Sequence, residues 1–141
     1  MSASDGQVLL RYDEPLTVVR LGPGADIPAW ASSGTLFSVT ATAIETSLVC
    51  GAAGVPRKAR QHGPLTAFAV EGPLDLGLTG VLHGLLAPLA EAEVPVLTLA
   101  TFDTDWILVA AGHADRAAEA WRRRGIEVRQ ATPSKSSEGQ E

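Results

Sequence analysis

Apolar residues recur along the second half of the chain at the spacing of two amphipathic helices. The first predicted helix covers about residues 78–92, and its apolar positions lie three or four residues apart on one face. This face consists of Leu78, Val81, Leu82, Leu85, Leu86 and Leu89. The second helix covers about residues 114–124, where Ala114, Ala117, Ala118 and Trp121 form the apolar face and Gly125 is suited to end the helix.

Short aliphatic and β-branched runs flank these helices and predict strands. They cover about residues 65–71, 96–102, 106–110 and 126–130. With the helices, the element order becomes β-α-β-β-α-β. This order predicts an α+β fold in which a ferredoxin-like unit at residues 64–130 has an antiparallel sheet with both helices on one face.

The first half of the chain looks like a shortened copy of the second. Residues 35–50 align with residues 95–110 at a constant offset of 60, and a Gly-Pro pair follows the first strand of each half. Chance agreement between two hairpins is the alternative interpretation, but the shared Gly-Pro favours a degenerate βαββ half at residues 16–63. In that half the helix is reduced to a turn around residues 27–31, and the last helix and strand are missing.

The remaining segments are predicted to lie outside the two units. Residues 1–15 form an N-terminal segment, and residues 57–63 form an exposed linker between the halves. The polar residues 131–141 are expected to be a disordered tail.

Composition and charge narrow the possible function classes. Hydrophobic residues make up 45% of the 141 residues, which is enough to bury a core, and the formal net charge of −5 argues against binding nucleic acid or anionic membranes. The single cysteine, Cys50, fits a reducing compartment. The N-terminus does not resemble a signal peptide, and charged residues and prolines interrupt the apolar stretch 78–99. We therefore expect a cytoplasmic protein.

Catalytic constellations are missing from the sequence. The three histidines have no second ligand at metal spacing, no nucleophile or phosphate-loop motif occurs, and Cys50 is expected to be a small buried hydrophobe. Asp103 and Asp105 are expected to bond their own backbone in a strand-connecting turn. Arg57, Lys58 and Arg60 are interpreted as part of a solvated linker, with phosphate contact as the alternative. We expect neither a metal nor a cofactor.

The start of the first helix is the strongest candidate for a binding site. Two glycines flank Thr79, and free amides at a helix N-terminus suit a carboxylate. A plain capping or packing role for Thr79 and Gly80 is the alternative. Asp105 is expected to lie near this helix start, where it can pair with an amino group. The two features together fit an α-amino acid.

Several segments resemble the ACT-domain family. They are VEGPLD and LTGVL between residues 70 and 82, LATFDTDWILV at 99–109, and the earlier VVRL, IPAWA and FSVT. The likeness covers about residues 16–130 and is closest to small bacterial tandem-ACT proteins related to the ACT modules of aspartate kinases and of CASTOR-type arginine sensors. TFDTDWILV is its most specific string.

The resemblance implies a ferredoxin-like fold, an amino-acid ligand, a regulatory role and pairing of modules through sheet edges. It also implies a set of ligand contacts, of which the last two come from a second subunit: Leu78, Thr79, Gly80, Val81, Thr101, Phe102, Asp105, Pro95 and Val96. The arginine-sensing relatives have an acidic residue in place of Leu78. A neutral or apolar amino acid therefore suits this chain better than arginine.

The sequence thus predicts a non-catalytic, amino-acid-binding regulatory protein that forms a homodimer. Two alternatives belong to other classes. One is a ligand-free interaction module that pairs through its sheet edges. The other is a small enzyme that uses Asp103, Asp105 and His83, although the helical pattern turns His83 towards solvent.

Overall fold

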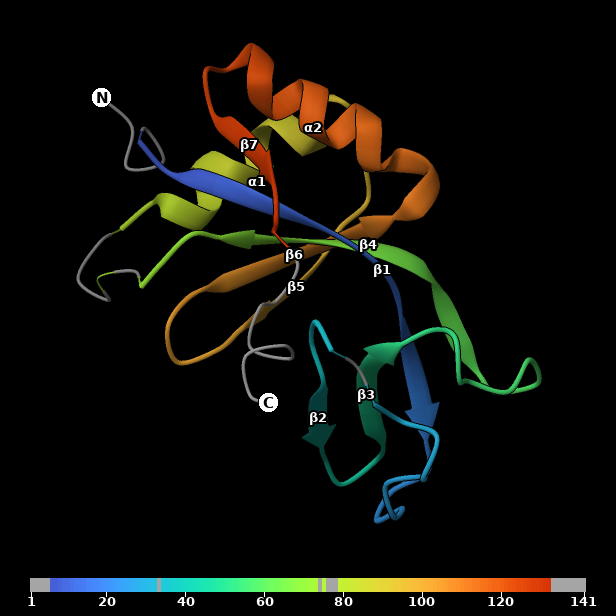
Figure 1. Cartoon of the computed structure of the whole chain (residues 1–141). Coiled ribbons are helices and arrows are strands. Elements are labelled where there is room, and N and C mark those ends of the chain that lie inside the picture. The colour runs from blue at the N-terminus through green and yellow to red at the C-terminus, as the bar shows by residue number, and fades with distance from the viewer. Residues whose placement is uncertain (1–5, 33, 74, 76–78, 133–141) are drawn as a thin grey trace, which may run out of the picture.

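The computed structural model describes residues 6–32, 34–73, 75 and 79–132. In these parts of the chain, two α-helices and a short 3-10 helix accompany seven strands of one sheet (Figure 1). In chain order the elements are β1 (Val8–Leu21), β2 (Ser38–Ala41), β3 (Thr46–Gly51), β4 (Gln61–Val70), α1 (Val81–Glu91), β5 (Leu97–Ala100), β6 (Asp105–Ala110), η1 (Ala111–His113), α2 (Ala114–Arg123) and β7 (Glu127–Gln130).

Both predicted helices are present, and their apolar faces point into one core. On α1, Val81, Leu85 and Leu89 are buried while His83 is exposed. The predicted face of α2 is buried entirely. These helical residues pack with Leu9, Phe68, Val70, Ile107 and Val109 of the sheet. The helices therefore cover one face of the sheet, as the periodicity predicts.

The end of α2 follows from its sequence. Gly125 has a positive φ of 80°, a conformation that glycine adopts without steric cost. The Gly125 and Ile126 amides donate to the carbonyls of Arg122 and Trp121, at 2.9 and 3.0 Å. This is the Schellman pattern of helix termination. The prediction of Gly125 as the stop is confirmed.

The long strands β1 and β4 hold the molecule together. They pair antiparallel, and the sheet order β2-β3-β1-β4-β6-β5 places a hairpin on each side of them. In Figure 1 both strands run from beneath the helices into the lower part of the molecule, where β2 and β3 lie. The two halves are thus portions of one continuous sheet.

This arrangement corrects two sequence-based boundaries and one prediction about the sheet. The N-terminal segment 1–15 is not separate from the units, because β1 begins at Val8 and pairs with β4 over residues 9–12. The linker 57–63 ends early, because Gln61 and His62 already pair with β1. Finally, β7 pairs in parallel with β1, so the sheet is not purely antiparallel. In a ferredoxin-like unit formed by residues 64–130 alone, β7 would pair with β4, but here β1 lies between these two strands. An aperiodic stretch such as 8–15 carries no local signal for such an insertion.

The two hairpins are equivalent, but at an offset of 59 instead of 60. The β2–β3 hairpin pairs Ala41 with Thr46, and the β5–β6 hairpin pairs Ala100 with Asp105. In the turns, the Thr42 amide donates to the Glu45 carbonyl at 2.9 Å, and the Thr101 amide donates to the Thr104 carbonyl at 2.8 Å. A one-residue slip moves every side chain to the other face of a strand, so the offset of 59 is the one that preserves which residues face inward.

Three apolar clusters fill the fold. The first lies between the helices and the sheet. The second, on the other face, joins Leu16 and Val49 of the first half to Leu65, Ala67 and Leu108. The third contains Val19, Leu48 and Cys50, and is covered by a turn at Ala31 where a helix would otherwise stand. The second cluster contains residues of both halves, so their cores form together.

Neither helix in the described part of the chain is long and apolar enough to span a membrane.

Trp121→Phe tests the contact between α2 and α1. The buried Trp121 indole donates from Nε1 to the Leu85 carbonyl at 2.7 Å and packs edge-on against Phe68. We expect the substitution to lower the free energy of unfolding by about 1–3 kcal/mol, because a buried hydrogen bond and part of a packed ring are lost. Urea denaturation measures this. Trp30→Phe, at a half-buried tryptophan in the other half, is the control and should cost less.

The reactivity of the Cys50 thiol tests whether the apolar cluster of the first half is buried. Burial, and to a smaller extent the negative charge of Glu14, raises the pKa of this thiol. Less thiolate is therefore present at pH 8 than for a free thiol, and alkylation by iodoacetamide should be slow until the protein unfolds. Fast labelling of the native protein would contradict the packing of this cluster. Because the folded-state pKa is raised, the thiol favours the folded state below its unfolded-state pKa, and this contribution is lost as pH rises through the folded-state value.

Candidate functional site

A cleft lies between the start of α1 and the turn that joins β5 to β6. Its volume is about 250 Å³, and it is open to solvent. Its lining residues are Asp75, Gly80, Val81, Leu82 and the run from Ala100 to Asp105. Two segments about twenty residues apart in sequence therefore meet at one site.

The helix start supplies hydrogen-bond donors to the cleft. Gly80 precedes the first turn with φ at 78°, and no side chain of the described residues caps the helix. The first-turn amides of an α-helix have no acceptor within the helix, and the helix dipole adds partial positive charge at this end. The absence of a Cβ on Gly80 lets a ligand approach the backbone. This end of the cleft suits a carboxylate.

The opposite wall is a turn fixed by threonines. Thr101 Oγ1 donates to the Thr104 carbonyl at 3.2 Å, and Thr104 Oγ1 donates to the Val70 carbonyl at 2.6 Å. The second bond ties the turn to the end of β4. The turn spans residues 101–104 and Asp105 begins β6, so the predicted Asp103-Thr104-Asp105 turn is displaced. The hydroxyls of the threonines hold the turn, a role that the sequence had assigned to the aspartates.

Acidic residues dominate the polar lining of the cleft. Asp75, Asp103 and Asp105 belong to it, and neither lysine nor arginine does among the residues that the structure describes. Asp105 is half-buried at the start of β6, where strand pairing with Ala100 fixes its backbone. A cationic group entering from this side would find a carboxylate held by the sheet.

Most of the predicted contacts come together here. Gly80, Val81, Thr101, Phe102 and Asp105 line the cleft. Thr79 is exposed beside it, and Leu78 lies outside the described residues.

Pro95 and Val96 lie elsewhere in the chain. They precede β5, whereas the cleft is at the other end of that strand, so within one chain they line a separate apolar groove with Leu97 and Leu108. The resemblance to the ACT-domain family implies that these two residues contact a ligand bound to a second subunit, which a single chain does not test.

Some lining residues were missed by sequence reasoning. Asp75 and Leu82 lie in the strings VEGPLD and LTGVL but were not predicted as ligand contacts. Thr104 was interpreted as a turn residue, and Asp103 as a turn residue or, in the enzyme alternative, a catalytic carboxylate. The spacing from the helix start offered a signal for Leu82, since it lies in the first turn. Nothing local pointed to Asp75, because its place in the cleft depends on the path of the chain between β4 and α1.

In the described part of the chain, the titratable side chains that line the cleft are the three aspartates, without a histidine or cysteine beside them. His83 is exposed on α1 and is not part of the cleft lining. Within the described residues, no group of three or more histidine, cysteine, aspartate or glutamate side chains is placed to hold a metal ion. The cleft has helix-start amides at one wall and carboxylates at the other.

Comparison with protein families identifies both halves. Residues 64–123 match the family model of the ACT domain, and residues 14–58 match a second model, which describes an N-terminal domain. No curated protein matches the chain in sequence.

Solved structures share the architecture. The protein Atu0741 from Agobacterium tumefaciens is 26% identical, with a TM-score of 0.82, over 90% of this chain and 95% of that one. VC0802 from Vibrio cholerae, described as a possible transport protein, is 13% identical, with a TM-score of 0.70, over 86% of this chain and 90% of that one.

Two aspartate kinases contain a similar fold. The enzyme from Clostridium acetobutylicum is 10% identical, with a TM-score of 0.60, and the match covers 82% of this chain and 33% of the kinase. The enzyme from Synechocystis is 13% identical, with the same TM-score of 0.60, over 94% of this chain and 29% of the kinase. At these identities the likeness concerns the fold alone. Residues 64–123 therefore form an ACT domain.

Proposed function

We propose that this protein is a non-catalytic regulatory module that binds a free α-amino acid in the cleft between α1 and the β5–β6 turn. The observation that carries the proposal is the meeting of the N-terminus of α1 and Asp105 in one small cleft. The helix amides donate hydrogen bonds to the ligand carboxylate, and Asp105 pairs with its ammonium group. A volume of about 250 Å³ suits a ligand of this size.

The comparisons support a regulatory role in general terms. The matching family is the ACT-domain family, and one structure with a similar fold belongs to an aspartate kinase described as an allosteric enzyme. That description applies to the kinase. For this chain it supports the class of function, and the ligand itself comes from the chemistry of the cleft.

A second copy of the chain would complete the site. Strand β5 is an edge of the sheet, and Leu97 on it is 43% exposed. Two β5 strands that pair antiparallel about a two-fold axis place the start of one beside the end of the other. Pro95 and Val96 of one protomer would then lie near Thr101 and Phe102 of its partner. This also gives a reason for the 93% exposure of Phe102 in the single chain.

A thermal-shift screen against the twenty amino acids tests the ligand. An amino acid at about a hundred times its Kd should stabilise the folded protein by about 2.7 kcal/mol and raise its Tm. Asp105→Ala should abolish the response while the protein remains folded, because Asp105 is only half-buried. Asp26→Ala is the matched control, since it removes an exposed carboxylate outside the cleft and should leave the response unchanged.

A flat screen with pure, folded protein would overturn the amino-acid proposal. It would favour the alternative interpretation, a ligand-free module that pairs through its sheet edges.

Leu97→Lys tests the two-fold pairing. A lysine on an edge strand opposes strand pairing, so the variant should sediment as a monomer at concentrations where the wild type is a dimer. Ile27→Lys changes a residue of similar exposure, 45%, on a loop of the first half, and should leave the dimer intact. A monomeric wild type at all accessible concentrations would contradict the pairing.

A further inference from the structure

We propose that the first half of the chain carries a second binding site, which takes a small oxyanion with two negative charges, such as a phosphate group. The site is a cleft of about 410 Å³ where β3, β1 and the start of β4 lie side by side. The side chains that give it its chemistry are Arg20, Arg60, His62, Ser47 and Glu45. It lies in the other half of the chain from the proposed amino-acid cleft and does not depend on it.

Two arginines face each other across neighbouring segments in this cleft. Val19 pairs with Gln61, and the Arg20 amide donates to the Arg60 carbonyl at 2.9 Å, which continues the same register. Residues directly opposite in an antiparallel pair point to the same face of a sheet, so both guanidinium groups enter the cleft. Like charges in this position destabilise a sheet. Two of the eleven lysine and arginine residues of this protein, whose net charge is −5, therefore lie side by side in an arrangement that lowers the stability of the fold.

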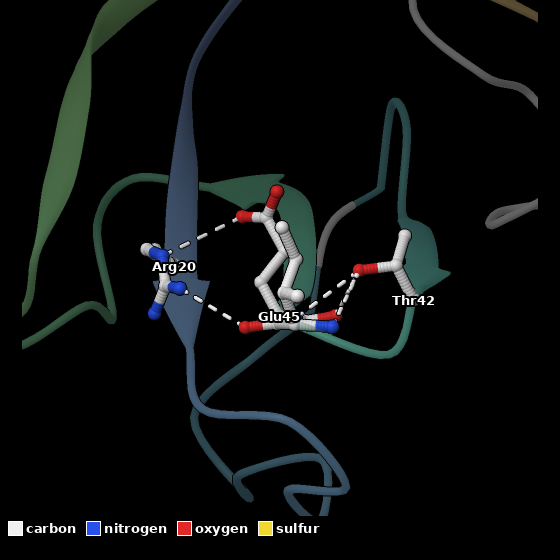
Figure 2. Close-up of polar contacts among 4 residues, drawn as sticks. Arg20, Thr42 and Glu45 are labelled. Atoms are coloured by element: carbon white, nitrogen blue, oxygen red, sulfur yellow. Dashed lines mark hydrogen bonds and ion pairs between the residues drawn. The ribbon is translucent and has the colours of Figure 1, made fainter.

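Arg20 is held in place by the β2–β3 turn (Figure 2). Its Nη2 donates to the Ile44 carbonyl at 3.0 Å, and its Nε lies 3.7 Å from a carboxylate oxygen of Glu45. The turn is itself fixed, since the amides of Ile44 and Glu45 donate to Thr42 Oγ1 at 3.2 and 3.1 Å. The guanidinium group is therefore oriented before any ligand arrives.

Glu45 compensates only part of the positive charge. It is the one carboxylate that lines the cleft among the described residues. Arg60 is exposed and forms no ion pair within the described part of the chain. A net positive charge therefore remains at the site, and an anion placed between the two arginines would relieve their repulsion.

Two further donors complete the arrangement. Ser47 lies opposite Arg20 on β3, and His62 lies opposite Val18 on β4. A hydroxyl, an imidazole N–H and two planar guanidinium forks match the several oxygens of a phosphate or similar oxyanion. The cationic run at residues 57–60 left phosphate contact open as an alternative, and the structure adds the partners from β1 and β3 that the run lacked.

Titration with inorganic phosphate tests the proposal on the full chain. At constant ionic strength set with chloride, phosphate should raise the Tm and shift the amide resonances of Arg20, Ser47 and His62 to saturation. Glycerol phosphate in a second arm distinguishes a site for free phosphate from one that accepts a phosphate ester. Binding of either one supports the proposal.

Arg60→Gln should weaken this binding by about tenfold or more, because a charge-assisted contact is lost. The variant should fold, since Arg60 is exposed, and without phosphate it should be as stable as the wild type or more so. Arg57→Gln removes the same charge from the exposed segment beside the cleft and should bind phosphate as the wild type does. Equal weakening in both variants, or no response to phosphate beyond that to chloride, would overturn the proposal.

Discussion

The antiparallel pairing of β1 with β4 is the constraint on which the rest of the molecule depends. Each strand extends beyond a single half, so β1 carries β7 beside its first residues and β3 beside its last. Two register shifts along the β1–β4 pair divide it into an upper and a lower part. Such irregularities bend and twist a sheet locally, which lets the lower hairpin lie against the face that the helices leave open. Without this pair neither half would have a complete sheet or a complete core.

The same pair gives the two halves their equivalence. The order β2-β3-β1-β4-β6-β5 reads alike from both ends when β1 is exchanged for β4, and the two turns repeat the same threonine hydrogen bonds. The halves differ in what covers the sheet. Helix α1 in the second half directs first-turn amides at a cleft, whereas in the first half a turn at Ala31 takes the place of a helix. In the first half, Arg20 joins the hairpin turn to the central strand. Equivalent positions have thus acquired different chemistry.

Local patterns predicted what depends on short stretches of sequence. The apolar faces of α1 and α2, the stop at Gly125 and the hairpins all follow from spacing within about a dozen residues. The candidate cleft was predicted in large part because helix starts and strand turns carry recognisable residues. What failed depends on pairing between distant segments. The insertion of β1 beside β7 joins residues more than a hundred positions apart, and the meeting of Arg20 with Arg60 depends on strand register, which no single segment encodes.

The shared strands also decide how a ligand can act on this protein. Two domains joined by a linker can rotate about it, but halves that share β1 and β4 and an apolar cluster cannot separate without breaking the sheet. A response to a ligand must therefore arise at the periphery, where segments have few partners. The β5–β6 turn lies at the periphery: its own hydrogen bonds fix its shape, the Thr104 hydroxyl ties it to the end of β4, and its exposed Phe102 lies next to an edge strand. If the ligand and the second copy bind as proposed, both contact this turn, so occupancy and assembly would be linked through the turn and not through a hinge.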